Sequence, residues 1–369
     1  MRIALCTDGI FPQAMGGMQR HSRLLAEHLA RTGEVELVVL HPHAPGVFDP
    51  SLGIIEVPVA PIDTDKLYLR ELWRYSGRVA AELDRIRPDV VLAQGFSVWK
   101  GGERSHDRLI VHPHGLEMFQ GLTRKERLLG WPFRWALRRV LRQASACISL
   151  GGKLTDILRE QVKGTACRVV VLPNAVEVPA VPAPFPPVDG PLDLLFVGRF
   201  AFNKGIDVLV AVADRLVKEG RGGLVRFSLA GDGPLLADYQ AKGLPANIRL
   251  LGRVDDARLQ QLYIACHAFV LPTRFEGMPT VVLEAMAQAR PIFVSDVGAT
   301  AELVGPHNGY LLPPGDADAL YNAIIAFAER SPEVHAKMGR YSYERAAERF
   351  SWPAVTQGFL DVFRTLAAR

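Results

Sequence analysis

From residue 274 to residue 287 the chain contains the stretch Arg274-Phe275-Glu276-Gly277-Met278-Pro279-Thr280-Val281-Val282-Leu283-Glu284-Ala285-Met286-Ala287. Two glutamates with seven residues between them flank a Gly-x-Pro turn that opens an apolar helix. Pro279 suits the first helical position, because an N–H there would be unpaired anyway. The exposed N–H groups and the positive end of the helix dipole then form a seat for a phosphate.

The neighbouring sequence indicates where this seat lies in a fold. The apolar runs Ala268–Pro272 and Pro291–Ser295 predict buried strands on either side. Open α/β sheets bind ligands at the carboxyl ends of such strands. Glu276 precedes the seat, and Glu284 lies about a turn and a half inside the helix. A sugar nucleotide fits this layout, with its diphosphate on the helix end and hydroxyl-rich groups near both carboxylates. The alternative is a pair of glutamates on a solvated helix surface.

Composition indicates two domains. A chain of 369 residues fits two of roughly 150–180 residues, and 49% hydrophobic residues suffice for two cores. The first residues are too few to form a signal peptide, and no apolar run approaches the ~20 residues of a membrane span. Four scattered cysteines favour reduced thiols and a cytoplasmic location. A net charge of +4 does not imply nucleic acid as a partner.

Apolar strands alternate with helical stretches along both halves of the chain. In the first half the predicted strands are 3–6, 36–40, 90–92, 109–112, 146–149 and 169–172, with a helix at 18–31. A proline-rich run at 177–191 predicts a stiff interdomain linker, and the rhythm restarts at 192–197, 224–230 and 248–251. We therefore predict an α/β protein with two doubly wound parallel sheets. The domains are 1–176 and 192–351.

These features resemble a known family, the retaining glycosyltransferases of the family 4 type with the GT-B fold. The family pattern is Glu-x7-Glu followed by Ala-Met-Ala, and the resemblance extends from Gly16-Gly17 to Glu302. Ala289 stands where the family usually has Gly. The resemblance implies two Rossmann-like domains facing a cleft, with the acceptor on the N-terminal side and the nucleotide sugar on the C-terminal side. It also implies that a C-terminal helix at 352–369 crosses back to the N-terminal domain.

A second loop carries two cations. Arg199 and Lys204 follow the predicted strand 192–197, between Gly198 and Gly205. Taken alone, such a pair is more simply explained as solvated loop cations. The pattern resembles the family's Gly-Arg…Lys-Gly signature, whose cations grip the leaving diphosphate. Fixed cations can neutralise that developing charge, so we expect neither a metal nor another cofactor besides the donor substrate.

The resemblance also assigns roles to other residues. His114, rather than His112, lies near the reacting sugar, and the bare backbone of Gly16 and Gly17 approaches the donor phosphate. Gly231 lies by the nucleobase, Glu276 by the hydroxyls of the sugar and Glu284 by the ribose diol. The predicted catalytic residues are His114, Arg199, Lys204 and Glu276. The predicted substrate-binding residues are Gly16, Gly17, Arg199, Lys204, Gly231, Glu276, Gly277, Met278, Pro279, Thr280 and Glu284.

Two patterns in the sequence are candidates for metal sites. Asp63-Thr64-Asp65 resembles the Asp-x-Asp of metal-dependent glycosyltransferases, but Pro58 and Pro61 argue against a central strand before it. His112 and His114 have strand spacing but no evident third ligand. We predict no metal site.

Residues 122–142 are strongly cationic, with Glu126 as the only acid and Pro132 expected to split the segment into two helical pieces. Trp131, Phe133 and Trp135 lie among the arginines, as in helices that lie on membranes. The alternative is an ordinary helix whose aromatic side chains are in the core. Because the segment follows His114 on the acceptor side, we expect peripheral contact with an anionic membrane at the inner face of the cell membrane.

The sequence thus predicts a retaining, metal-independent glycosyltransferase. It would move a sugar from a nucleoside-diphosphate sugar to a hydroxyl of a lipid-linked or cell-envelope glycan. One alternative is a sugar-nucleotide 2-epimerase of the same fold, and another is a non-catalytic protein that binds sugar nucleotides. A dehydrogenase is disfavoured, because neither half has Gly-x-Gly-x-x-Gly after its first strand.

Overall fold

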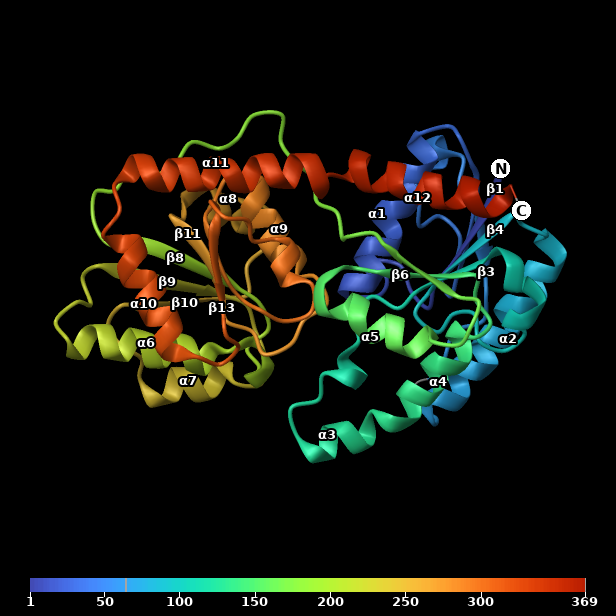
Figure 1. The fold of residues 1–369 in the computed structure, drawn as a ribbon, viewed down its shortest axis with the longest axis horizontal. Helices are drawn as coiled ribbons and strands as arrows, with labels where there is room; N and C mark the ends of the chain where they lie inside the picture. Colours follow the sequence, from blue (N-terminus) through green and yellow to red (C-terminus); the bar gives the residue numbers. More distant parts are fainter. Residues whose placement is uncertain (64, 369) are drawn as a thin grey trace. The chain divides into compact units, whose positions relative to one another are not determined.

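The computed structural model describes residues 1–63 and 65–368. The chain forms two compact units (Figure 1). Unit 1 contains Met1–Asn174 and the C-terminal segment from Trp352 onward, and unit 2 contains Ala175–Ser351. Among the described residues, no helix is long and apolar enough to cross a membrane.

Unit 1 is built on a parallel sheet with the strand order β3-β2-β1-β4-β5-β6-β7. Its strands are β1 (Arg2–Cys6), β2 (Glu36–His41), β3 (Ile55–Pro58), β4 (Val90–Gln94), β5 (Leu109–His112), β6 (Ala146–Ser149) and β7 (Arg168–Val171). Its α-helices are α1 (Gly17–Arg31), α2 (Tyr68–Ile86), α3 (Arg124–Leu129), α4 (Trp131–Leu141), α5 (Gly152–Val162) and α12 (Trp352–Ala367). Short 3₁₀ turns are η1 (Pro50–Leu52), η2 (Gly102–Arg108) and η3 (Glu117–Phe119).

Unit 2 repeats this plan with the strand order β10-β9-β8-β11-β12-β13, again all parallel. Its strands are β8 (Leu192–Val197), β9 (Val225–Ala230), β10 (Ile248–Gly252), β11 (Ala268–Leu271), β12 (Ile292–Ser295) and β13 (Gly309–Leu312). Its α-helices are α6 (Ile206–Lys218), α7 (Leu236–Lys242), α8 (Asp256–Ala265), α9 (Thr280–Ala287), α10 (Ala317–Ala328) and α11 (Pro332–Arg349), with 3₁₀ turns η4 (Phe202–Lys204) and η5 (Thr300–Glu302).

The predicted doubly wound α/β fold is confirmed in both units. The central strands are continuous apolar runs that are buried on both faces, as β4 and β11 illustrate. In each sheet the first strand of the unit lies next to its fourth, β1 beside β4 and β8 beside β11. The chain direction of the crossovers reverses there, and α/β folds bind ligands in the crevice at such a switch point.

Two strands were not predicted, and both are short. β3 ends in Pro58 and pairs only with β2 at the sheet edge, where a residue without an N–H is tolerated. β13 is an edge strand that begins at Gly309 and is only partly buried. The break in the cationic segment also differs from expectation. α3 and α4 meet at Gly130, whereas Pro132 lies in the first turn of α4, where its missing N–H costs nothing.

Residues 177–191 lie in unit 2 and are held along its surface. The carbonyl of Pro179 accepts a hydrogen bond from the Tyr343 hydroxyl at 2.7 Å, and the carbonyl of Pro184 accepts one from the buried Arg290 at 2.7 Å. At the start of this segment Val176 forms a parallel β-bridge with Ser351. The proline-rich segment is therefore attached to one unit for most of its length.

Candidate functional site

The loops that follow β8 and β11 bring two predicted site residues into direct contact. Lys204, at the end of η4, forms an ion pair through Nζ with Oε1 of Glu276, which lies between β11 and α9. Their side chains are 23% and 13% exposed. Sequence reasoning assigned Lys204 to the diphosphate and Glu276 to the sugar without expecting this contact. The pair lies at the switch point of unit 2.

The pair is held in place by residues that sequence reasoning left without a role. Arg274 donates to both carboxylate oxygens of Asp207 at 2.8 and 2.6 Å and to the carbonyl of Phe202 at 2.7 Å. Its guanidinium also lies 4.0 Å from the centre of the Phe202 ring. The Thr273 hydroxyl and the Arg274 N–H both donate to the carbonyl of Asn203, at 2.8 and 2.7 Å. These contacts fasten the loop of Lys204 to the loop of Glu276.

The predicted phosphate seat is the start of α9. The helix begins at Thr280, and Pro279 is its N-cap rather than its first residue. No side chain caps this end by a hydrogen bond. Gly277 and Met278 precede it, and the carbonyl of Gly277 accepts from the N–H of Ala299. The first-turn N–H groups and the positive helix end are therefore not used by a capping side chain.

Glu284 lies one turn into α9 and has a partner on another helix. The hydroxyl of Tyr263, on α8, donates to Oε2 of Glu284 at 2.8 Å. Tyr263 is 1% exposed, so the phenol is fixed by packing. This hydrogen bond orients the carboxylate that the sequence assigned to the ribose. Tyr263 follows no sequence pattern that would have pointed to it.

Gly231, at the end of β9, packs against the loop of Arg199. A Cβ at Gly231 would lie 1.9 Å from the carbonyl oxygen of Gly198, and its φ of +140° favours glycine. The N–H of Phe200 donates to the carbonyl of Asp232 at 2.9 Å, which joins the two loops. Arg199 is exposed and makes no ion pair among the residues that the structure describes. Its charge is therefore available to a ligand.

The remaining predicted residues lie in unit 1. Gly16 is the N-cap of α1 and Gly17 its first residue, after β1. One turn into α1, the ring of His21 lies 5.1 Å from that of His114, so the glycine loop and His114 are near one another. His114 has a φ of +58° and is hydrogen-bonded through Nε2 to Oε1 of Gln94, at the end of β4.

The His114 ring is neutral over a wide pH range. Burial, with a smaller contribution from His21, holds the pKa of His114 well below its usual value. His112 stacks on His114 with ring centres 3.8 Å apart, and burial also lowers the pKa of His112. The rings of His112 and His114 therefore stack on one another and do not converge on a common metal position.

The described residues contain no group of three or more His, Cys, Asp and Glu side chains that could hold a metal. Asp63 pairs with Lys66 at 2.5 Å. Thr64 of the Asp-x-Asp pattern lies outside the described residues. All four cysteines are free and buried.

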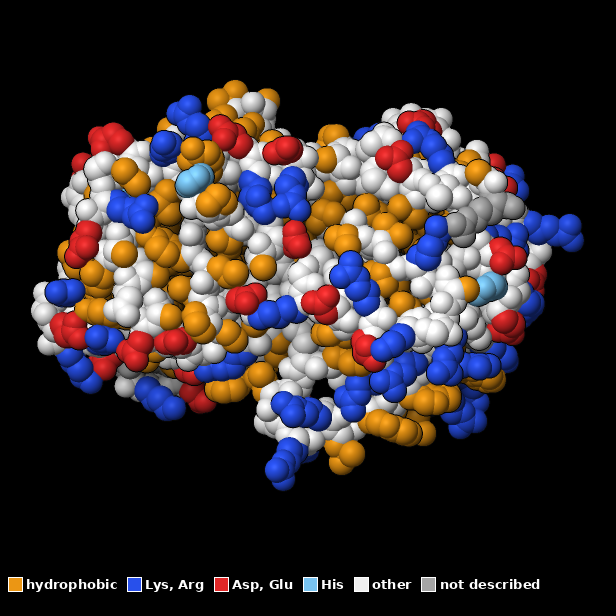
Figure 2. Space-filling view, in the orientation of Figure 1, with side chains coloured by type: hydrophobic (Ala, Val, Ile, Leu, Met, Phe, Trp, Pro, Cys, Tyr) orange, Lys and Arg blue, Asp and Glu red, His pale blue; other side chains and the backbone are white. Residues whose placement is uncertain are grey.

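Residues 122–142 place aromatic and cationic side chains at the surface. Trp131 and Trp135 are 62% and 56% exposed, so these two indoles are not in the core. Leu128 and Leu129 are exposed beside them. Figure 2 shows the cationic side chains next to hydrophobic ones over α3 and α4. Within this part of the chain, Glu126 is engaged in a capping box with Thr123, and hydrogen bonds to backbone N–H groups lower its pKa.

Comparison with known proteins agrees with this architecture. Residues 15–178 match the family described as Glycosyltransferase Family 4, and residues 191–330 match the family described as Glycosyl transferases group 1. The chain belongs to the family 4 glycosyltransferases with the GT-B fold. It is accordingly a glycosyltransferase.

Individual relatives are distant. The chain is 25% identical to a glycogen synthase of Mycobacterium tuberculosis, over 100% of this chain and 95% of that protein. It is 35% identical to the putative teichuronic acid biosynthesis glycosyltransferase TuaC of Bacillus subtilis, over 39% of this chain and 36% of that protein.

Two solved structures share the fold. Sucrose-phosphate synthase from Thermosynechococcus elongatus has a TM-score of 0.78 and 21% identity, covering 100% of this chain and 99% of that chain. Anabaena HepE in complex with UDP-glucose has a TM-score of 0.70 and 18% identity, covering 99% of this chain and 100% of that chain.

Proposed function

We propose that the protein is a retaining, metal-independent glycosyltransferase that takes its sugar from a nucleoside-diphosphate sugar. The observation that carries the proposal is the grouping at the switch point of unit 2. Arg199 is exposed there, Lys204 is paired with Glu276, and the start of α9 has no capping side chain. The positive groups exceed the negative ones, which suits a diphosphate.

The proposed chemistry follows from charge. As the bond between sugar and diphosphate breaks, negative charge grows on the leaving oxygen, and fixed cations stabilise it. Arg199, Lys204 and the α9 N-terminus would supply this stabilisation in place of a metal ion. When the diphosphate takes up the charge of Lys204, Glu276 can turn its oxygens to the hydroxyls of the sugar.

Retention is proposed to proceed by attack on the face that the diphosphate leaves. The bond from the anomeric carbon to the leaving phosphate oxygen breaks while the bond to the acceptor oxygen forms on the same side. The leaving phosphate oxygen takes the proton of the acceptor hydroxyl. This pathway requires no protein nucleophile.

We assign His114 to the sugar. A neutral imidazole does not repel the positive charge that develops on the ring as the leaving group departs. The lowered pKa of His114 and its hydrogen bond to Gln94 support this role. A protonated histidine at the same place would oppose the reaction.

The proposed donor and acceptor take support from relatives. HepE is described as binding UDP-glucose, which supports a nucleotide sugar as donor. The name of TuaC refers to teichuronic acid synthesis, which supports a glycan acceptor. We propose a lipid-linked or cell-envelope acceptor, reached by peripheral contact of residues 122–142 with the anionic inner face of the cell membrane. The exposed Trp131 and Trp135 among cations support that contact.

The test is a donor and acceptor screen with analysis of the product. Nucleoside diphosphates that bind should raise the melting temperature, and the matching sugar nucleotides then enter assays with and without a chelator. NMR should show the anomeric configuration of the donor retained in the glycoside, at equal rates in both assays. Inversion, or a strict metal requirement, contradicts the proposal. Conversion of donor without acceptor indicates an epimerase, and binding without turnover indicates a non-catalytic protein.

A further inference from the structure

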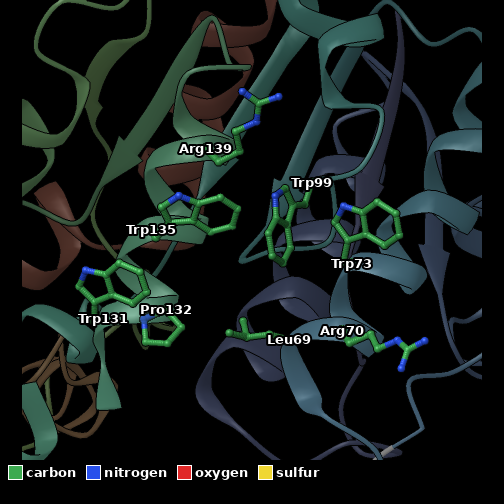
Figure 3. Close-up of a pocket in the computed structure, with 8 residues that line it drawn as sticks. All are labelled: Leu69, Arg70, Trp73, Trp99, Trp131, Pro132, Trp135 and Arg139. Atoms are coloured by element: carbon green, nitrogen blue, oxygen red, sulfur yellow. The ribbon is translucent and has the colours of Figure 1, made fainter. Parts of the chain in front are cut away.

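A groove on unit 1 contains four of the five tryptophans of the chain. Its volume is about 440 Å³, within the range of sites that hold a small ligand or part of a chain. Its walls come from α2, from the segment after β4 and from α4 (Figure 3). The lining residues are Leu69, Arg70, Trp73, Trp99, Trp131, Pro132, Trp135 and Arg139.

The indoles form an apolar floor. Trp99 is 8% exposed and meets Trp135 edge-on, with ring centres 6.2 Å apart. Figure 3 shows the four indoles in a row from Trp131 through Trp135 and Trp99 to Trp73. Trp73, Trp131 and Trp135 remain 42% to 62% exposed, so a large apolar surface lacks a cover.

The polar atoms of the lining side chains are all hydrogen-bond donors. Indole N–H groups and guanidinium groups donate and do not accept. The lining contains no Asp, Glu, Asn, Gln, Ser or Thr. A carbohydrate needs acceptors for its hydroxyl protons, and these side chains offer none. A phosphate, by contrast, presents only acceptor oxygens when it is ionised.

The cations lie at the edges of the apolar floor. Figure 3 shows Arg70 and Arg139 with their guanidinium groups turned away from the indoles. Among the described residues, neither side chain makes a hydrogen bond or an ion pair. Lys100 lies 4.2 Å from the centre of the Trp73 ring and adds a third positive charge. An apolar floor edged by unpaired cations fits a molecule with an apolar chain and an anionic head.

We propose that this groove binds the lipid anchor of the acceptor, a single apolar chain that ends in a phosphate. The inference rests on the proposed function and narrows it. The chain lies along Trp131, Trp135 and Trp99, and the phosphate is held by Arg139. Contact of residues 122–142 with a bilayer would place the groove where such a lipid is available. The groove would then bind a single apolar chain with a terminal phosphate more tightly than it binds other anionic lipids of the membrane.

Binding can be measured without sugar transfer. The probe is a brominated alkyl phosphate, used below its critical micelle concentration, that quenches tryptophan fluorescence. We expect saturable quenching with one molecule per chain, at least tenfold weaker binding of the matching brominated alcohol, and no competition by millimolar inorganic phosphate. Arg139→Glu keeps every tryptophan and should raise the Kd at least tenfold. Arg340→Glu, an exposed arginine on α11 of unit 2, is the matched control and should change nothing.

Vesicles separate the two sources of an anionic lipid. Two types of vesicle are made from a neutral lipid and given the same total negative charge, one with a few per cent polyprenyl phosphate and the other with phosphatidylglycerol. The vesicles with polyprenyl phosphate should sediment more of the protein. Trp135→Ala, at an exposed position, should remove that preference and keep its melting temperature. Ile264→Ala, on exposed apolar surface of unit 2, is its control. Equal sedimentation by both vesicles, or unaltered quenching in Arg139→Glu, overturns the proposal.

Two other results bear on the assignment. Self-association that Trp135→Ala abolishes, without binding of the alkyl phosphate, would assign the groove to a second copy of the chain and overturn the proposal. Both groove variants should bind nucleoside diphosphate as the wild type does, since none of the predicted donor-binding residues lines the groove. If the wild type binds the probe but transfers no sugar in the donor and acceptor screen, the proposed function is refuted and the groove assignment stands.

Discussion

Replacing Tyr263 by Phe removes one hydroxyl and tests the role of Glu284. Tyr263 lies on α8 and is buried, and its hydroxyl donates to Oε2 of Glu284 at 2.8 Å. A hydrogen bond to a charged group contributes about 1.5–3 kcal/mol. Glu284 is only partly buried, so water can replace part of that contribution. We expect a loss of about 1–1.4 kcal/mol in nucleoside diphosphate binding, which is roughly a fivefold to tenfold higher Kd.

Calorimetry with two ligands gives this prediction its specificity. If Glu284 binds the ribose diol, the wild type should prefer a nucleoside diphosphate over its 2′-deoxy form by about tenfold, or ~1.4 kcal/mol. In Tyr263→Phe this preference should shrink, because the carboxylate is no longer oriented. Tyr321→Phe is the matched control, since it removes another tyrosine–glutamate hydrogen bond, to Glu219 in the same unit. Equal weakening of both ligands by Tyr263→Phe would refute the reasoning.

Three further predictions concern the cation, the second carboxylate and the histidines. Lys204→Ala should lower turnover about a hundredfold or more with the fold intact, and a chelator should leave the wild type unaffected; near-normal turnover of the variant would contradict this. In calorimetry, Glu276→Ala should spare binding of the nucleoside diphosphate but weaken binding of the sugar-bearing donor. Glu284→Ala should instead weaken binding of the nucleoside diphosphate itself. Burial lowers the pKa of His21 to about 4 and that of His114 well below 6.5, so only the unfolded chain takes up these protons. Stability should therefore be full above about pH 6.5 and fall toward pH 4, less steeply in His21→Phe.

The sequence predicted those features that depend on neighbours along the chain. The buried parallel strands, the glycine-containing loops and the start of α9 each follow from local patterns of apolar residues, glycine and proline. The residues at the switch point of unit 2 could therefore be named in advance. Their boundaries shifted by about one residue, as at Pro279, because a helix end depends on the last hydrogen bond formed.

Contacts between distant residues could not be predicted in this way. Lys204 and Glu276 are 72 positions apart, and their pairing depends on β8 lying next to β11. Tyr263 meets Glu284 because α8 and α9 lie close together, and no pattern on α8 marks that tyrosine. Arg274 stood in the decisive stretch, yet its partner Asp207 is 67 positions away. Single-chain patterns contain no information about such pairings.

The tryptophan groove shows the same limit. Trp131 and Trp135 can be singled out from the sequence because they lie among arginines in one segment. Trp73 lies on α2 and Trp99 follows β4, so these two indoles join the others only in the folded unit. The aromatic residues of a segment could be found from the sequence, but their arrangement into a groove required the fold.

The attachment of residues 177–191 to unit 2 determines which parts of the chain connect the units. Because Pro179 and Pro184 are held by Tyr343 and Arg290, the proline-rich segment belongs to unit 2 and is not itself a connection. The chain passes between the units only after Asn174 and after Ser351, and the bridge of Val176 with Ser351 holds these two passages side by side. Lengthening the proline-rich segment should therefore change the surface of unit 2 and leave both connections between the units at their present length.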